Sequence, residues 1–216
     1  MLKDIALLVQ IAFYIIGATI AILTYRSAKR GLLNTVNTEY HKRVIDHLEK
    51  LSETLYSEFD PDSDSYIARS FNINRIARER LEVHNQIHGG KYPQDLILHR
   101  VELTELESKL YKLIKELKSS PFLPDHIVNY TVEYLTGRVK SINDIKMKYY
   151  FEILHKEMKK DGIIPPEGIN HLVYWFEQSV RYGINKSEYG EEEVEMEVHK
   201  IRTMIKDYLK SFNPLP

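Results

Sequence analysis

An arginine and a histidine six positions apart, Arg78 and His84, are the residues whose types and spacing best suit catalysis. Cleavage of RNA by its own 2′-hydroxyl needs a general acid or base that titrates near neutral pH, which histidine provides. It also needs a cation beside the phosphorane, which arginine provides. The pair is therefore a candidate ribonuclease centre. Glu79 would repel a phosphate, however, and the same stretch fits a solvated helix face in which Arg78 pairs with Glu82.

Other residue groups imitate known metal sites but lack part of the pattern. Three aspartates in 60–64 are spaced like the first ligands of an EF-hand loop, yet Ser65 replaces the required glycine and Phe71 the final glutamate. His84 and His88 are one helical turn apart, but no glutamate or third ligand accompanies them as H-E-x-x-H requires. We therefore expect neither a metal site nor a cofactor.

Residues 5–25 form a run of 21 residues without Asp, Glu, Lys or Arg. A helix of that length spans roughly 31 Å, which matches the hydrocarbon core of a bilayer. The basic residues Arg26, Lys29 and Arg30 follow the run, whereas the charge of a cleaved signal peptide precedes its apolar region. Basic flanks stay on the cytoplasmic side. The pattern predicts a single-pass anchor with the N-terminus outside and the remainder of the chain in the cytoplasm.

Small or polar residues recur along this run at steps of three and four, which places them on one stripe of the helix. They are Ala6, Gln10, Tyr14, Gly17, Ala21, Thr24 and Ala28. Small residues let membrane helices approach closely, and polar ones hydrogen-bond across the contact. The stripe predicts self-association, either as a pair of helices or as a ring whose stripe lines a pore. The alternative is a membrane helix that tolerates one glutamine.

Composition limits what the rest of the chain can do. It contains no cysteine, which excludes disulfides, cysteine nucleophiles and thiolate zinc sites. The formal net charge is −1 with 28% charged residues, so the predicted surface is mixed rather than strongly basic. Binding of duplex nucleic acid through bulk charge is therefore not expected.

Apolar residues follow helical spacing nearly throughout, and no stretch alternates like a strand. We predict an all-α chain with two parts: an anchor with its basic flank at 1–30, and a helical domain of about five helices at 31–216. The anchor helix is expected to continue as a rod through 33–55, with Gly31 as a potential bend. Further helices are predicted at 72–88, 94–117, 125–160, 172–182 and 191–212. Gly137 or 141–144 could divide the fourth. The aromatic residues expected in the core are Tyr149, Tyr150, Phe151, Trp175 and Phe176.

The Arg78–His84 spacing resembles the R-x(4–6)-H motif of the HEPN superfamily. Those domains are all-α, are often ribonucleases, and bring two copies of the motif together at a dimer interface. The layout of one N-terminal span, one HEPN-like helical domain and one divergent motif resembles the small membrane accessory protein of type VI-B CRISPR systems. That resemblance implies an oligomeric pore in the bacterial inner membrane which strengthens antiphage defence. It also implies an RNA-guided RNase as partner, and a motif that is no longer catalytic.

Three functions follow from these observations. The favoured one is a non-enzymatic homo-oligomeric pore that permeabilises or depolarises the inner membrane, in contact with the lipid bilayer. The second is a membrane-tethered ribonuclease that uses His84 as acid or base and Arg78 to hold the scissile phosphate across a dimer. The third is a non-enzymatic membrane adaptor that recruits a cytosolic partner through its helical faces. Whether the domain binds RNA is left open.

Overall fold

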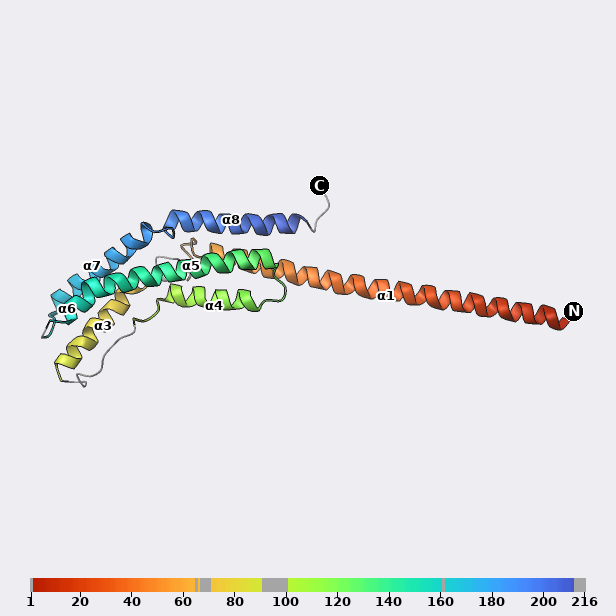
Figure 1. Cartoon of the computed structure of the whole chain (residues 1–216), viewed down its shortest axis with the longest axis horizontal. Coiled ribbons are helices and arrows are strands. Elements are labelled where there is room, and N and C mark those ends of the chain that lie inside the picture. Colours follow the sequence, from red (N-terminus) through yellow and green to blue (C-terminus); the bar gives the residue numbers. More distant parts are fainter. Residues whose placement is uncertain (1, 65, 67–70, 91–100, 161, 212–216) are drawn as a thin grey trace. The chain divides into compact units, whose positions relative to one another are not determined.

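The computed structural model describes residues 2–64, 66, 71–90, 101–160 and 162–211, except for the side chains of 2–9 and 12. The chain divides into two compact units, Met1–His47 and Leu48–Pro216. Every regular element in the described residues is a helix (Figure 1), so the predicted all-α class is confirmed.

The first unit consists of most of α1 (Leu2–Tyr56), whose last turns belong to the second unit. The predicted rod is continuous, and Gly31 lies inside it in helical conformation. From Gln10 to Leu33 every side chain that the structure describes is exposed. Towards its C-terminal end the helix buries Leu48, Leu51 and Leu55 at steps of three and four.

The predicted transmembrane helix is wrong. Within the described residues no helical segment combines the length and the apolar character needed to cross a membrane. The predicted span drew on the apolar residues at 5–9 and 12, whose side chains lie outside the described residues, and from Phe13 onwards the run reaches the charged Arg26, Lys29 and Arg30 before it is long enough to cross a bilayer. The predictions that depended on this span, namely a membrane protein, a pore and an inner-membrane location with the N-terminus outside, are corrected with it.

The second unit is a helical bundle built around its longest helix, α5. Its elements are α3 (Ile73–His88), α4 (Glu105–Ser119), α5 (Asp125–Tyr149), η1 (Tyr150–His155), α6 (Lys156–Met158), α7 (Pro166–Asn185) and α8 (Glu191–Lys210). Helix α5 contacts α4, α7 and α8, while α3 contacts α7. Apolar residues at helical spacing line these contacts, as in the Val194, Val198, Ile201 and Ile205 row of α8.

Helix α4 begins eleven residues later than predicted, at Glu105 instead of 94. Thr104 and Glu107 form a reciprocal capping box: the threonine hydroxyl accepts from the backbone N–H of Glu107, and the Glu107 carboxylate accepts from that of Thr104. Residues 101–104 are not helical. The part of the prediction at 94–100 lies outside the described residues.

The same capping glutamate forms a fully buried ion pair with Lys146 of α5. Lys146 Nζ lies 2.6 Å and 2.8 Å from the two carboxylate oxygens of Glu107 and 3.0 Å from the backbone oxygen of Glu102. An ammonium group has three N–H donors, so each of these donors has an acceptor. This ion pair therefore connects the start of α4 to α5.

The predicted division of α5 at Gly137 or 141–144 is wrong, since the helix continues through both. It changes instead at Tyr150, where one turn of π-helix, η1, leads into the short helix α6. Tyr150 and Leu154 of η1 are buried, whereas Phe151 is half exposed. Single π turns within α-helices are rare and occur often at functional sites.

Helix α7 is longer than predicted and passes Gly183, which was expected in a loop. A Cβ at Gly183 would lie 2.7 Å from Ile145 and 2.9 Å from Tyr149, so the glycine lets α7 approach α5 closely. The buried face of α7 carries Ile169, Val173, Phe176 and Val180. Trp175, predicted in the core, is instead 51% exposed.

Candidate functional site

The structure places Arg78 and His84 on different faces of α3. Six residues correspond to about 240° around an α-helix, so the two side chains cannot share a face of this helix. Arg78 is exposed, and its Nη2 donates to Oδ1 of Asn170 on α7 at 2.8 Å. His84 is 7% exposed. Within one chain, the predicted arginine–histidine pair is therefore not brought together.

The arginine that does share a face with His84 is Arg80, one turn earlier. Both side chains are buried, and neither Arg80 Nη1 nor His84 Nε2 has a hydrogen-bond partner among the described residues. Sequence analysis did not select Arg80, because arginine is rarely buried. Two features of the sequence could have indicated that Arg80 is buried beside His84. The two residues are four positions apart, and Arg80 lies between the apolar residues Ala77 and Leu81.

Burial dominates the electrostatics of this face. It lowers the pKa of His84, the proximity of His88 lowers it further, and a backbone group of Gly162 acts in the opposite direction. Burial also raises the pKa of the Tyr150 hydroxyl, which the charge of nearby Arg80 partly counteracts. His84 is thus favoured in its neutral form, in a position that has little access to solvent.

The solvent-facing side of α7 carries an unexpected row of aromatic residues. We call it the outer face of α7; it consists of His171, Tyr174, Trp175, Gln178 and Tyr182. These positions repeat at three and four residues, and all five side chains are exposed. The three large aromatic side chains are 51–62% exposed. Helix α7 therefore presents one apolar face to the core and a second, aromatic face to solvent.

Contacts between neighbouring side chains fix the positions of the aromatic residues on the outer face of α7. Trp175 Nε1 donates to Nε2 of His171 at 2.7 Å, and the Trp175 ring meets that of Tyr174 edge-on at 6.0 Å between centroids. At the other end, the ammonium of Lys186 lies 5.9 Å from the centre of the Tyr182 ring. Aromatic side chains ordered before binding lose less conformational entropy when a partner covers them.

A wide groove between α3 and α7, of about 420 Å³, adjoins this face at Tyr174. Arg75 and Arg78 line it from α3, and Asn170 and Glu177 from α7. Arg75 is paired with Glu79 at 2.9 Å, and Glu177 with Arg181. In the described residues, Arg78 has only the neutral Asn170 as a hydrogen-bond partner, so its charge is available to an incoming carboxylate.

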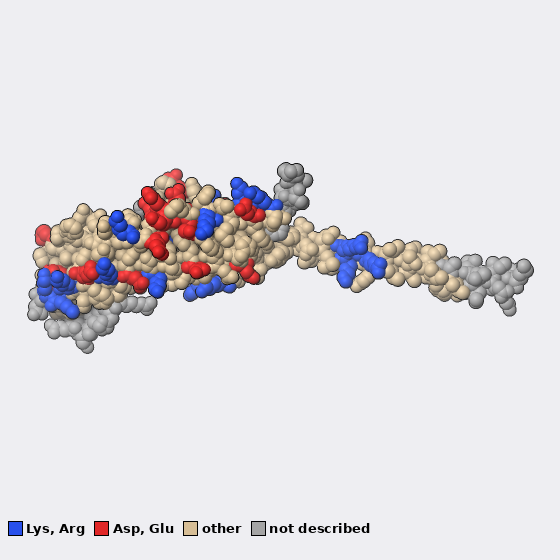
Figure 2. Space-filling model, turned by 45° about the horizontal axis from the view of Figure 1, so that its top comes forward, with Lys and Arg blue, Asp and Glu red and all other residues tan. Residues whose placement is uncertain are grey.

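Charges of both signs are intermixed on the face of the bundle that Figure 2 shows. The groove repeats this mixture, because glutamates lie beside its arginines. A nucleic-acid surface is instead predominantly basic. Among the described residues no group of three or more His, Cys, Asp and Glu side chains could hold a metal ion.

The predicted stripe on α1 contains Gln10, Tyr14, Gly17, Ala21, Thr24 and Ala28, all of which are exposed. Gln10 Nε2 donates to the Tyr14 hydroxyl at 3.3 Å, so these two polar groups satisfy each other within the helix. The side chain of Ala6 lies outside the described residues.

Comparisons of the chain with protein-family models, with curated proteins and with solved structures give no match. The resemblance to HEPN domains and to the type VI-B accessory protein therefore stays a prediction.

Proposed function

We propose that this chain is a non-enzymatic adaptor that binds a partner protein through the outer face of α7 and the adjoining α3–α7 groove. The observation that carries the proposal is the exposure of Tyr174, Trp175 and Tyr182 on one helix face. Tyrosine, tryptophan and arginine are the residue types that contribute most binding energy at protein interfaces. Contiguous exposed aromatic surface on a helix that also buries a full core face indicates a docking site.

The chemistry of the surface supports a protein rather than a nucleic acid as partner. Glu79 and Glu177 beside the groove neutralise Arg75 and Arg181, and the formal net charge of the chain is −1. The groove therefore offers one acidic group a single cation, Arg78, and not the row of cations that a phosphate backbone requires. A protein segment with apolar anchors for the aromatic row and one carboxylate for Arg78 is complementary to both features. Binding of this kind retains the adaptor hypothesis without the membrane anchor.

The two other functions from the sequence are not carried forward. The pore required a membrane span, which the described helices do not provide. The ribonuclease required Arg78 and His84 of two chains to meet across a dimer interface, and the 7% exposure of His84 leaves little of its ring accessible to a second chain.

The proposal can be tested by placing the photo-cross-linker p-benzoylphenylalanine at position 175 in cells. The same substitution at Met196, which is 64% exposed on α8, is the matched control. We expect a specific protein adduct from position 175 and none from position 196. The protein identified by the cross-link is then purified in unmodified form and titrated with the intact chain by calorimetry, which gives a signal for variants without tryptophan as well.

In that titration, Trp175→Ala and Arg78→Ala should each weaken binding by roughly tenfold or more, as expected for interface residues that contribute over 1.4 kcal/mol. Met196→Ala should leave the affinity unchanged. The adaptor proposal is rejected if position 175 cross-links only to RNA or to nothing, or if Trp175→Ala binds the purified partner like wild type. A cross-link to a second copy of this chain would replace the adaptor by a homo-oligomer.

A further inference from the structure

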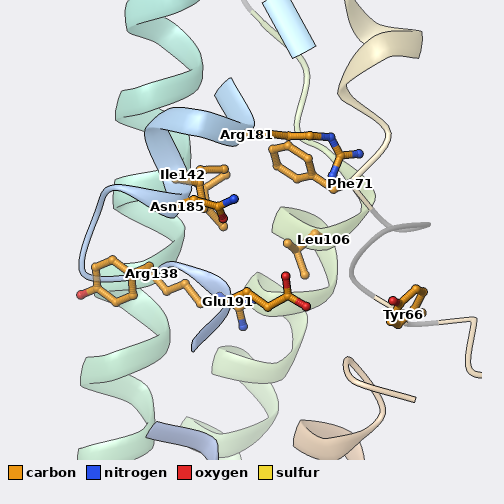
Figure 3. A pocket seen from close by; sticks show the side chains of 10 residues that line it. Tyr66, Phe71, Leu106, Arg138, Ile142, Arg181, Asn185 and Glu191 are labelled. Atoms are coloured by element: carbon orange, nitrogen blue, oxygen red, sulfur yellow. The ribbon is translucent and has the colours of Figure 1, made fainter. Parts of the chain in front are cut away.

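A second site lies away from the outer face of α7, where the end of α7 and the start of α8 meet α4 and α5. It is a partly enclosed cavity of about 160 Å³. Figure 3 shows Phe71, Leu106 and Ile142 at its apolar wall, with Arg181, Asn185 and Glu191 around it. A cavity of about 150 Å³ accommodates benzene, so one planar ring system fits here.

Arg138 lines the cavity from α5 and is almost completely buried, with 1% of its surface exposed. Its Nη1 lies 2.7 Å from Oε2 of Glu58 in an ion pair whose geometry is not that of a hydrogen bond, and neither atom has another hydrogen-bond partner among the described residues. The charge of Arg138 is thus compensated, while its hydrogen-bonding capacity is not used up. A guanidinium group has five N–H donors, and an unused buried donor is unfavourable until something accepts from it.

Further unpartnered polar atoms occur on the same face of α5. Thr131 and Tyr134 precede Arg138 by seven and four residues, and their buried hydroxyls also lack hydrogen-bond partners among the described residues. Burial raises the pKa of Tyr134, so this phenol stays protonated and can donate. Native proteins leave few buried polar atoms without partners. Tyr134 borders a separate pocket with Tyr130 and Glu197, so of these three residues Arg138 is the one that lines the cavity.

Tyr189 is held at the cavity by a specific glycine. A Cβ atom at Gly137 of α5 would overlap the Tyr189 hydroxyl, so only glycine lets this side chain lie against the helix. The Tyr189 ring also lies 5.9 Å from that of Tyr134. The wall that Tyr189 contributes to the cavity therefore depends on a residue of a different element, which is expected of a preformed site.

The charges around the cavity favour a neutral ligand. Arg138 is paired with Glu58, and Arg181 with Glu177 at 3.0 Å, so neither cation needs an anionic ligand. The guanidinium of Arg181 also lies 5.5 Å from the centre of the Phe71 ring, which fixes its plane. Glu191, at the cavity and exposed, forms no ion pair among the described residues and can accept hydrogen bonds.

We propose that this cavity binds a purine base of the guanine type. Such a base is planar and neutral, which suits the apolar wall and the paired arginines. Its O6 and N7 accept two hydrogen bonds from one guanidinium, which Arg181 or Arg138 can supply. Its N–H groups on the opposite side would donate to the carboxylate of Glu191. Because the cavity is open on one side, a ribose attached to the base can extend into solvent.

The test is calorimetric titration of the full chain with guanosine and with adenosine. Adenosine has the same size, but its N6 amino group would place a donor against arginine and its N1 an acceptor against glutamate. We expect guanosine to bind roughly tenfold or more tightly than adenosine, the discrimination typical of a bidentate contact. Equal affinities for the two nucleosides, or no binding of guanosine, would overturn the proposal.

Substitutions at the rim avoid the buried ion pair and so keep the fold intact. Glu191→Gln and Arg181→Gln should each weaken guanosine binding by roughly tenfold. Asn185→Phe should abolish it, because the larger ring of this exposed residue occupies the cavity. Lys206→Gln, an exposed charge change on α8, should bind guanosine like wild type. The site is rejected if the three rim variants bind like the Lys206→Gln control while their thermal unfolding is unchanged.

Discussion

Helix α5 carries two buried cations, Arg138 and Lys146, two turns apart, and their surroundings differ. Lys146 has an oxygen atom for each of its three donors, two from Glu107 and one from a backbone carbonyl. Arg138 has one carboxylate, from Glu58, at a distance that neutralises its charge but in a geometry that leaves Nη1 without a hydrogen bond. In the first pair every donor of the cation has an acceptor, and we call it the closed pair. The second pair borders a cavity and retains donors that a ligand could use, and we call it the open pair.

The largest effect should follow from breaking the closed pair. Lys146→Met leaves the carboxylate of Glu107 buried without its counter-charge, so we expect the free energy of unfolding to fall by about 3–5 kcal/mol. Equilibrium unfolding in urea measures it. Adding Glu107→Gln removes the stranded charge and preserves the capping box, because glutamine also serves at that position. The double variant should therefore recover most of the loss; a double variant as unstable as Lys146→Met would contradict our interpretation.

Breaking the open pair should be less severe. Glu58→Gln leaves Arg138 without its carboxylate, but water in the adjoining cavity can accept hydrogen bonds from the guanidinium. We expect a loss of about 1–3 kcal/mol in the same urea experiment. A loss equal to that of Lys146→Met would show that the two pairs are energetically alike, and the comparison would fail.

His84 extends the comparison to a buried titratable group with an unpartnered nitrogen. Its pKa in the folded chain is below that of an ordinary histidine, chiefly through burial. Between that lowered pKa and the unfolded value of about 6.5, the unfolded chain binds more protons, so stability rises with pH across this interval. Urea unfolding from pH 7 to pH 5 should therefore show a loss on acidification that His84→Gln reduces. Met196→Ala, which removes an exposed side chain that carries no proton-binding group, should retain the wild-type slope.

The smallest effect on folding is expected on the outer face of α7. Trp175→Ala should change the free energy of unfolding by less than about 0.5 kcal/mol, because the side chain is half exposed. The adjacent Phe176 is fully buried, and Phe176→Ala should cost about 3–5 kcal/mol. Thermal unfolding of the two variants separates the faces. If Trp175→Ala is as destabilising as Phe176→Ala, then Trp175 belongs to the core and is not free to dock a partner.

Helices whose ends are marked by helix-breaking residues could be predicted from the sequence. The expected helix at 72–88 differs from α3 by one residue, because Gly89 and Gly90 end it. The start of α4 was missed although the Thr104-x-x-Glu107 signature of a capping box is present. The turn of π-helix could not be found, since an i→i+5 turn leaves no regular apolar pattern.

The candidate sites could be predicted only in part. Of the aromatic residues of α7, Trp175 and Phe176 were both assigned to the core, which is right for Phe176 and wrong for Trp175, because a helix with two apolar faces does not reveal which one is covered. Ile169, Val173, Phe176 and Val180 fill the inner face and leave Trp175 outside. Arg138 lies near to Glu58 only after folding brings the end of α1 to α5. The spacing of residues along the sequence gives no information about a contact between two positions so far apart.

The turn of π-helix after α5 has a genetic consequence. Its wider i→i+5 turn accommodates one residue more than an α-helical turn would need. Loss of the codon for the half-exposed Phe151 would permit an unbroken α-helix, and the residues after it would keep nearly their present orientation relative to α5, because the π turn already holds the additional residue. The same loss within Asp125–Tyr149 would rotate every later residue by about 100° and move the fully buried Leu154 out of the core. The gene should therefore tolerate deletion of this codon better than deletion of one codon within α5.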